Sequence, residues 1–240
     1  MQIVENKKYV RGRLKIGNIA NLASMGLLVV GFVASLKTDT FGQGAILFAY
    51  IALIGAFLLL SFGRSFTRRW GPRFRQDQWL VDGLRGVDNR YTMFNYAAPG
   101  LPDHLVVGPG GLFVLVPRSN GGTIRFQNGR WSRGSLAGGL LRGLAEGGLG
   151  NPFTDANRAL GQLAGYLRKH GSEELIAGLE AKPILVFTNP SARLEVAPNP
   201  PIPIVQTKGL RQIFRRAKDT LPSEKVEELK RVLGREAADE

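Results

Sequence analysis

The stretch PDHLVVGPGGLFVLVPRSN, residues 102–120, carries charged side chains in positions suited to chemistry. It predicts two β-strands joined by a glycine turn, with Asp103 opening the first strand and Arg118 closing the second. A carboxylate so placed can bind a metal ion, and an arginine can hold a phosphate through two hydrogen bonds. The two charges could instead pair with each other across the strands. The stretch is therefore either a catalytic hairpin or only the core of a sheet.

Helices and strands alternate around this hairpin. A helix is predicted near residues 76–87 from the spacing of Trp79, Leu80, Leu84 and Val87. Strands are predicted at YTMFNYA, HLVV, LFVLV, TIRF, near Trp131, at KPILVFTNP and at residues 204–206. Further helices are predicted after Asn151-Pro152, near residues 208–218 and near residues 223–233. This order is typical of an α/β or α+β domain with a mixed central sheet.

Two uncharged, apolar runs fill the N-terminal quarter of the chain. Ile16 to Leu36 and Thr40 to Gly63 each supply the ~20 residues that a helix needs to cross a bilayer. Because only residues 37–39 separate them, we expect a tight transmembrane hairpin over residues 16–63, with helices at about 17–36 and 42–63. A cleaved signal peptide fits poorly, since a second apolar run follows at once. A buried helical pair in a soluble core is the other alternative.

Basic residues flank the predicted hairpin on both sides. Residues 1–15 form a basic N-terminus, residues 64–75 a basic juxtamembrane linker, and residues 76–240 the main domain with its C-terminal helices. The positive-inside rule places both termini in the cytoplasm, as for a two-helix protein of the cell membrane. The same residues are expected to contact anionic lipid headgroups. They are Lys7, Lys8, Arg11, Arg13 and Lys15 before the hairpin, and Arg64, Arg68, Arg69, Arg73 and Arg75 after it.

The composition argues against some kinds of metal site and favours anionic partners. The chain has no cysteine and only two histidines, which argues against thiolate and zinc sites. Its net charge of +13 favours anionic partners, either nucleic acid or anionic lipid. Residues 64–240 hold 26 basic and 17 acidic residues, but five of those basic residues belong to the juxtamembrane linker. Nucleic acid is therefore a possible but not a required partner.

Residues 71 to about 215 resemble a NERD (nuclease-related) domain, a bacterial branch of the PD-(D/E)xK nuclease fold. The family pattern has an acid-bearing helix, Asp-His before Val-Val-Gly-Pro-x-Gly, then Val-Phe-Val-Ile-Glu-x-Lys. Asn-Pro-x-x-Gln then opens a helix, and a later strand ends in Phe-Thr or Phe-Ser. This chain has DHLVVGPGG from Asp103, LFVL from Leu112, NPFT from Asn151 and VFT from Val186, in that order. The resemblance implies a restriction-endonuclease-like α/β domain with a mixed sheet, following the transmembrane hairpin.

The resemblance also implies a magnesium site, and this chain departs from it. The family's glutamate falls on Val116 and its lysine on Arg118, while Asp103 is retained. The glutamine that opens the helix falls on Asp155, and the acid of the first helix corresponds to Asp77. An isopropyl group cannot bind Mg²⁺. Arg118 keeps a positive charge but cannot give up a proton at working pH. Asp103 and Arg118 are thus the vestigial catalytic residues.

Three functions remain open. The first is a membrane-anchored NERD-like pseudoenzyme with a degenerate site, acting as a binding or scaffold module and needing no cofactor. The second is an active nuclease with Mg²⁺ held by a rearranged set, Asp77, Asp103 and Asp155. The third is an accessory subunit of a membrane protein complex, with the domain as a packing surface. Because Val116 removes a metal ligand, the sequence favours a protein that is not an enzyme.

Overall fold

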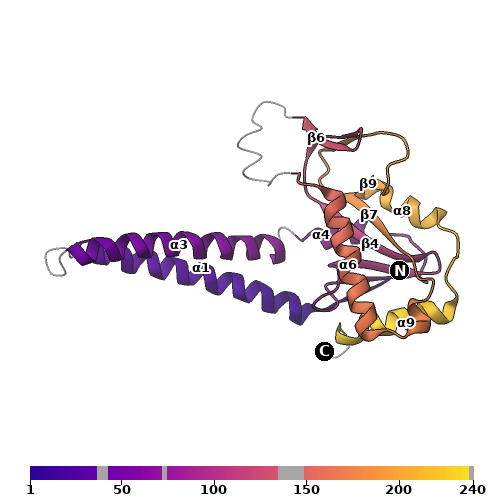
Figure 1. Ribbon diagram of the computed structural model, residues 1–240, viewed down its shortest axis with the longest axis horizontal. Helices are drawn as coiled ribbons and strands as arrows, with labels where there is room; N and C mark the ends of the chain where they lie inside the picture. Colours follow the sequence, from indigo (N-terminus) through magenta and orange to yellow (C-terminus); the bar gives the residue numbers. More distant parts are fainter. Residues whose placement is uncertain (37–42, 72–74, 135–148, 238–240) are drawn as a thin grey trace. The chain divides into compact units, whose positions relative to one another are not determined.

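The computed structural model describes residues 1–36, 43–71, 75–134 and 149–237, which form two compact units (Figure 1). One unit is a helical hairpin within residues 7–75. The other unit comprises residues 1–6 together with residues 76–240, and is a mixed α/β domain. The residues expected at the hairpin tip, 37–39, and the glycine-rich residues 135–148 lie outside the described residues.

The hairpin consists of α1 (Lys7–Leu36) and α3 (Gln43–Trp70), which pack against each other. Both helices are long and apolar enough to cross a membrane, and most of their apolar residues are exposed. At the base of the hairpin the helices extend beyond the predicted membrane-spanning segments. Helix α1 begins at Lys7 rather than near residue 17, and α3 continues to Trp70 through most of the expected linker. Lysine and arginine favour the helix, so the basic flanks extend it.

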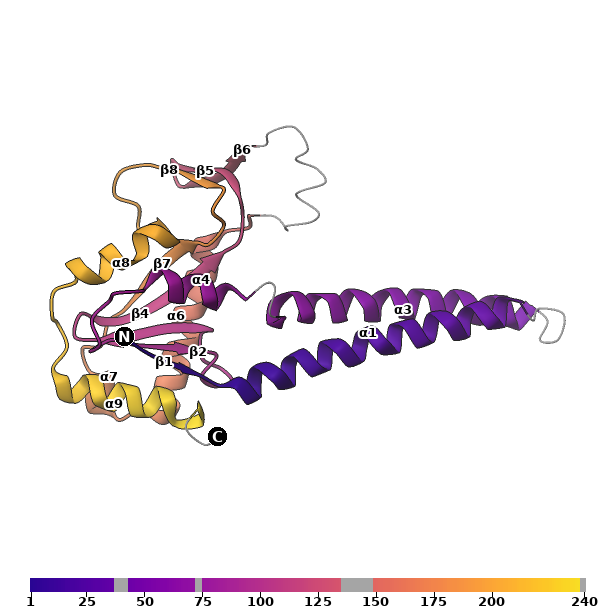
Figure 2. The same ribbon diagram turned by 180° about the vertical axis from the view of Figure 1, so that it is seen from behind.

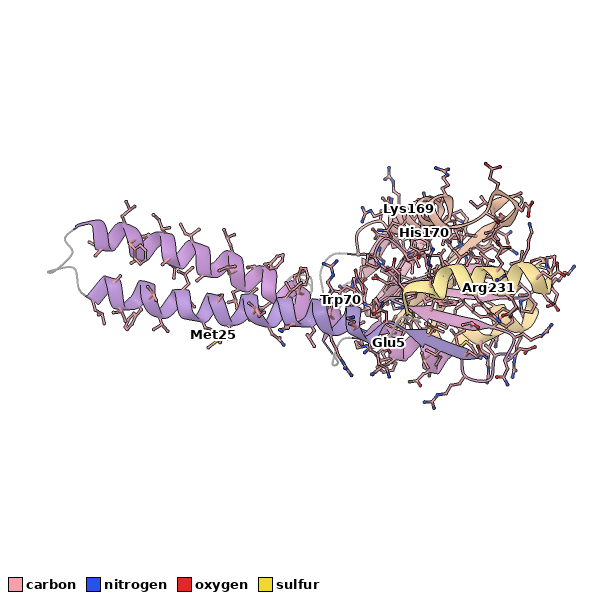
Figure 3. The ribbon with its side chains drawn as sticks, turned by 90° about the horizontal axis from the view of Figure 1, so that it is seen from below. Glu5, Met25, Trp70, Lys169, His170 and Arg231 are labelled. Carbon is pink, nitrogen blue, oxygen red and sulfur yellow. The ribbon has the colours of Figure 1, made fainter. Side chains whose placement is uncertain are left out.

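Small residues lie between the two helices, and large apolar residues lie outside. Gly17, Ser24 and Gly31 of α1 are buried at intervals of seven residues, Ala45, Ala52 and Ala56 of α3 are buried too, and Gly31 lies against Ala52. The large apolar side chains point outward instead, as Figure 3 shows for Met25, which is 62% exposed. A soluble helical pair buries its large side chains, whereas helices in lipid use small residues for close contact. The hairpin therefore has the side-chain distribution of a membrane-embedded pair.

Aromatic and basic residues gather where the two helices meet near Lys7 and Trp70. The rings of Tyr9 and Trp70 form an edge-on contact at 5.5 Å, and the Arg13 guanidinium lies 5.1 Å from the Tyr9 ring centroid. Tyrosine and tryptophan are enriched at membrane–water interfaces, because their rings are apolar and their edges are polar. This end of the hairpin is thus suited to the headgroup layer.

The close approach of the helices at Gly31 supplies a test. A Cβ atom at Gly31 would lie 2.8 Å from the Cβ of Ala52, whereas a Cβ at Gly26 would have no neighbour within 4 Å. We expect Gly31→Leu to lower the free energy of unfolding of the hairpin by about 1–3 kcal/mol through overpacking. Gly26→Leu is the control, with the same gain in helix propensity and no clash. Unfolding in mixed detergent micelles measures both, and equal stability of the two variants would contradict this packing.

A six-stranded sheet forms the centre of the α/β domain, in the order β1-β2-β3-β4-β7-β9. Its strands are β1 (Gln2–Glu5), β2 (Thr92–Asn95), β3 (His104–Gly108), β4 (Gly111–Arg118), β7 (Ala181–Phe187) and β9 (Ile204–Gln206). β2, β3 and β4 are antiparallel neighbours, while β1 is parallel to β2, and β4, β7 and β9 are parallel. The predicted mixed sheet is confirmed. The predicted hairpin of residues 102–120 is the pair β3–β4.

Helices cover both faces of this sheet. Leu112, Val114 and Val116 of β4 pack on one face against α6 (Pro152–His170), α7 (Glu173–Ile176) and α9 (Ser223–Gly234). Phe113 and Leu115 pack on the other face against α4 (Gln76–Gly83) and α8 (Thr207–Arg216). Helix α6 crosses in front of the sheet in Figure 1 and lies behind it in Figure 2. A short 3-10 helix, η1 (Arg235–Ala237), follows α9.

A second sheet of three strands has the order β6-β5-β8, formed by β5 (Gly122–Gln127), β6 (Arg130–Gly134) and β8 (Ala192–Val196). β5 and β6 form the predicted hairpin, with Asn128 and Gly129 at φ 50° and 73° as a tight turn requires. Phe126 and Trp131 of this sheet contact Phe153 at the start of α6. The second sheet is therefore fixed to the first turn of α6.

Strand β1 is an element that the sequence pattern does not predict. Within the basic N-terminal segment, residues 2–5 pair in parallel with residues 92–95 of β2, and α1 starts at Lys7. Val4 packs against the core formed with α6 and α9. The chain thus begins in the α/β domain, forms the hairpin, and returns to the same domain at α4.

The contrast between Val4 and Ile3 tests this pairing. Val4 is half-buried on the core, whereas Ile3 is 49% exposed. We expect Val4→Asp to lower the free energy of unfolding of the domain by about 1–3 kcal/mol, because a carboxylate would be placed against apolar side chains. Ile3→Asp should change it by less than about 0.5 kcal/mol. Urea unfolding of the full chain, followed by tryptophan fluorescence, measures both. Equal midpoints would refute a structural role for β1.

Candidate functional site

The residues expected to carry chemistry lie at one edge of the central sheet. Strand β4 ends at Arg118 and its parallel neighbour β7 ends at Phe187, while the antiparallel β3 begins beside the end of β4. Helix α6 packs on this sheet, and its first turn carries Asp155. Asn151 caps this helix by accepting a hydrogen bond from the backbone N–H of Phe153 at 3.1 Å, and Pro152 occupies its first position.

Arg118 is paired with Asp155. Its Nη2 atom donates a hydrogen bond to Oδ2 of Asp155, and Nη1 of Arg158 lies 3.3 Å from Oδ1 of the same carboxylate. The expected partner of Arg118 in the purely structural alternative is Asp103, and the structure corrects this to Asp155. Helix α6 brings this about, because its first turn lies over the face of the sheet toward which Val116 and Arg118 project. One carboxylate thus neutralises two arginines.

The Arg118 guanidinium is largely enclosed. Its side chain is 21% exposed, against 68% for Arg158. Its Nε atom is buried and has no hydrogen-bond partner among the residues that the structure describes. Burial lowers the pKa of Arg118, but an arginine remains charged in proteins at physiological pH. The backbone oxygen of Arg118 accepts hydrogen bonds from the N–H of Thr188 at 2.8 Å and from its hydroxyl at 3.2 Å, which fixes the strand end.

Val116 and Asp103 lie side by side on the same face of the sheet. The antiparallel register pairs Leu105 with Val114, and continuing it by two residues places Asp103 opposite Val116. Val116 is 9% exposed and belongs to the apolar core under α6. A packed isopropyl group therefore lies beside Asp103 at this strand end. The donor set at this strand end does not fit an ordinary magnesium site.

His104 lies on the other face and packs there. It is 2% exposed, its Nδ1 is 2.8 Å from Oδ1 of Asn95, and its ring contacts that of Tyr96 at 5.0 Å. The backbone of Tyr96 has φ 53°, which is uncommon for a residue other than glycine, and its N–H donates to the carbonyl of Asp103 at 2.8 Å. These contacts hold the connection between β2 and β3 at the same edge as Arg118.

Asp77 is separated from the Arg118–Asp155 pair by the sheet. It is 3% exposed in the first turn of α4, and α4 packs on the face opposite to α6. Within the described ranges, the structure brings no three His, Asp or Glu side chains into a group that could hold a metal ion. It joins Asp155 to Arg118 and does not gather Asp77, Asp103 and Asp155 into such a group.

A cavity of about 240 Å³ lies at the same edge, on the face covered by α4. It is lined by Trp79 of α4, which is 48% exposed, by Asn189 after β7, and by Thr207 and Lys208 at the start of α8. An exposed indole beside a lysine is suited to a flat ring that bears a negative charge. The sequence pattern assigns Trp79 only to an apolar helix stripe, so this cavity was not predicted.

The expected lipid-contacting residues lie on the helical hairpin. Lys7, Lys8, Arg11 and Lys15 are exposed on the first turns of α1, with Arg13 half-buried against Tyr9. Arg64 is exposed on α3, and Arg75 precedes α4. The side chains of Arg68, Arg69 and Arg73 lie outside the described part of the chain. Arg158 was not among the predicted site residues, although its spacing of three from Asp155 on one helix could have indicated it.

Comparison of the chain with protein-family models, curated proteins and solved structures gives no match. The fold and the placement of the residues above therefore carry the functional argument.

The pairing of Arg118 with Asp155 can be tested against an exposed pair. Asp155→Asn leaves the mostly buried Arg118 without its counter-charge, so we expect the free energy of unfolding to fall by about 1–2 kcal/mol. Asp82→Asn is the control, since Asp82 and Arg85 form an ion pair at 2.9 Å with side chains 52% and 80% exposed. Its loss should cost less than about 0.5 kcal/mol. Equal urea midpoints for the two variants would show that the Arg118–Asp155 pair contributes no more to the free energy of unfolding than an exposed ion pair does.

Proposed function

We propose that this chain is a membrane-anchored, NERD-like protein whose nuclease site is degenerate. Its α/β domain acts as a binding or scaffold module at the cytoplasmic face of the membrane, within a larger membrane assembly. The observation that carries the proposal is Val116, packed in the apolar core at the position where the family has its metal-binding glutamate. The two apolar helices provide the anchor.

The placement of the motifs on the fold supports the resemblance to a nuclease-like domain. Asp103 precedes β3, the glycine turn joins β3 to β4, Asn151 caps α6, and Phe187 ends β7. An acid, Asp77, lies on the preceding helix α4. Each motif therefore falls on the kind of element that the family pattern requires, and the antiparallel β2–β3–β4 arrangement puts the strand ends at one edge.

The contacts of Arg118 support a role in binding or structure rather than in catalysis. A lysine at this position could donate or accept a proton, whereas an arginine stays charged. Asp155, the acid nearest to it, is neutralised by Arg118 and Arg158. On the face covered by α4, the same end of the sheet offers Lys208 and the exposed Trp79, which suit an anionic partner such as nucleic acid or an acidic protein segment.

The connectivity of the domain supports the proposed topology. Strand β1 and helix α4 belong to the same domain and flank the hairpin in sequence. If both helices cross the bilayer, the chain leaves and returns on one side, because the domain cannot be divided by the membrane. The basic residues at both ends of the hairpin favour the cytoplasmic side.

A nuclease assay tests the degenerate site. The purified full chain is incubated with single- and double-stranded DNA and RNA in Mg²⁺ or Mn²⁺, together with the variants Asp103→Ala and Val116→Glu. We expect no cleavage by the natural sequence and no change in Asp103→Ala, because one ligand position is apolar. Cleavage that is lost in Asp103→Ala, and also in Asp77→Ala and Asp155→Ala, would instead establish the alternative, an active nuclease with rearranged carboxylates. A mobility-shift assay with the same substrates separates nucleic-acid binding from a purely protein-directed role.

Labelling of single cysteines tests the membrane topology, since the chain has no cysteine of its own. We expect Met25→Cys to react poorly with a membrane-impermeant maleimide even in open membranes, because the exposed Met25 side chain would face lipid. Lys169→Cys, on the surface of the α/β domain, should react only after intact cells are opened (Figure 3). Asp39→Cys, between the two apolar runs, should react in intact cells. Reaction of Lys169→Cys in intact cells would reverse the orientation.

A further inference from the structure

A larger cavity lies at the opposite end of the central sheet from Arg118. It has a volume of about 620 Å³ and is bounded by the first residues of β7, the last turn of α8 and the proline-rich segment before β9. Ligand pockets span roughly 300–1,000 Å³, so its size suits a small organic molecule. Phe113 contributes from the start of β4, five residues before Arg118. At ~3.3 Å per residue, the two sites are roughly 16 Å apart along the strand.

The floor of this cavity is apolar and rigid. Phe113, Ile184 and Ile213 line it, from β4, β7 and α8 respectively. Phe113 is held by an edge-on contact with Phe214 at 4.9 Å between ring centroids. Prolines contribute to the wall, and a proline ring fixes its own backbone torsion. Pro203 also accepts the backbone hydrogen bond of Leu185 at 2.9 Å, so the wall is tied to the sheet.

Three cations surround this apolar floor. They are Lys182 of β7, Arg216 at the end of α8 and Lys218 after it, and Glu180 is the single acid among the lining residues. Within the described part of the chain, none of the three cations forms an ion pair. The Nζ atom of Lys182 lies 5.9 Å from the centroid of the Phe113 ring, above the floor rather than out in solvent. A positive charge is thus held over an aromatic surface inside the cavity.

We propose that this cavity binds a small organic anion that has an apolar ring and one phosphate or carboxylate group. The ring would lie against Phe113, Ile184 and Ile213, and the anionic group would contact Lys182, Arg216 and Lys218. An inorganic anion would leave the apolar floor exposed to water, and an uncharged ring would leave the three cations without a counter-charge. Only a ligand with both parts satisfies the whole lining, since apolar burial and charge-assisted hydrogen bonds then act together.

The test uses the full chain in phosphatidylcholine nanodiscs, so that no anionic lipid competes. Three probes are titrated by calorimetry: 1-naphthyl phosphate, 1-naphthol, which lacks the charge, and inorganic phosphate, which lacks the ring. We expect saturable one-to-one binding of 1-naphthyl phosphate, with at least about tenfold weaker binding of the other two probes. 1-Naphthol loses a charge-assisted hydrogen bond, which typically contributes that much, and inorganic phosphate loses the burial of the ring.

Two variants and one control locate the binding. Lys182→Met keeps the length and apolar character of the side chain but removes its charge, and should weaken 1-naphthyl phosphate about tenfold. Ile213→Trp, at a half-buried position, should block the cavity and abolish binding. Lys169→Met is the control, since Lys169 is an exposed cation on α6 and lines neither this cavity nor the one beside Trp79. Its affinity should stay within about twofold.

The proposal is overturned if 1-naphthyl phosphate shows no saturable binding, if 1-naphthol or inorganic phosphate binds as tightly, or if Lys169→Met and Lys182→Met weaken binding equally. Lys218→Ala, at an exposed position after α8, provides a second charge variant if Lys182→Met fails to fold. Because these readouts involve neither nuclease activity nor membrane insertion, they are independent of the proposed function.

Discussion

The pairing of β1 with β2 is the constraint on which the rest of the architecture depends. Gln2 pairs with Thr92 and Glu5 with Asn95, so the first residues of the chain are part of a sheet whose other strands all follow the hairpin. Such a contact between distant segments closes a long loop, whose entropic cost must be recovered by hydrogen bonds and by the burial of Val4. The hairpin is thus an insertion within one domain, and both of its ends are fixed by the fold.

The hairpin and the domain bury opposite kinds of side chain. In the α/β domain the fully buried side chains include Phe94, Phe187 and Leu105, whereas the most buried residues of α1 and α3 are small, among them Ser24 and Ala56. Water drives large apolar groups inward, and lipid removes that drive, so that close backbone contact decides which residues lie between helices. One chain therefore contains a domain that buries large apolar side chains and a hairpin that buries small ones. The boundary between the two lies between Asn6 and the first turns of α1. The aromatic pair Tyr9–Trp70 lies in this region.

At the end of the central sheet, an apolar residue decides how the neighbouring charged side chains pair. With an apolar Val116, no carboxylate remains beside Asp103 on β4, and Arg118 finds its counter-charge on α6 instead. The ion pairs of Asp155 with Arg118 and Arg158 then connect the end of the central sheet to the first turn of α6. An acid in the first turn also stabilises the helix through the helix dipole. This strand end is thus a structural joint between the central sheet and α6.

The local sequence determined most of the secondary structure. The long apolar runs predicted α1 and α3. Short runs of β-branched and aromatic residues, separated by turn residues, predicted β2 to β7, and Asn151-Pro152 predicted the start of α6. It could not predict β1, because QIVE is too short to show a period and its partner lies far away in sequence. Nor could it choose between Asp103 and Asp155 as the partner of Arg118. Spacing along a strand gives the face on which a side chain lies, but only the packing of α6 on that face decides which carboxylate comes within reach. The two cavities likewise arise where β7, β9 and α8 meet, and no single segment encodes them.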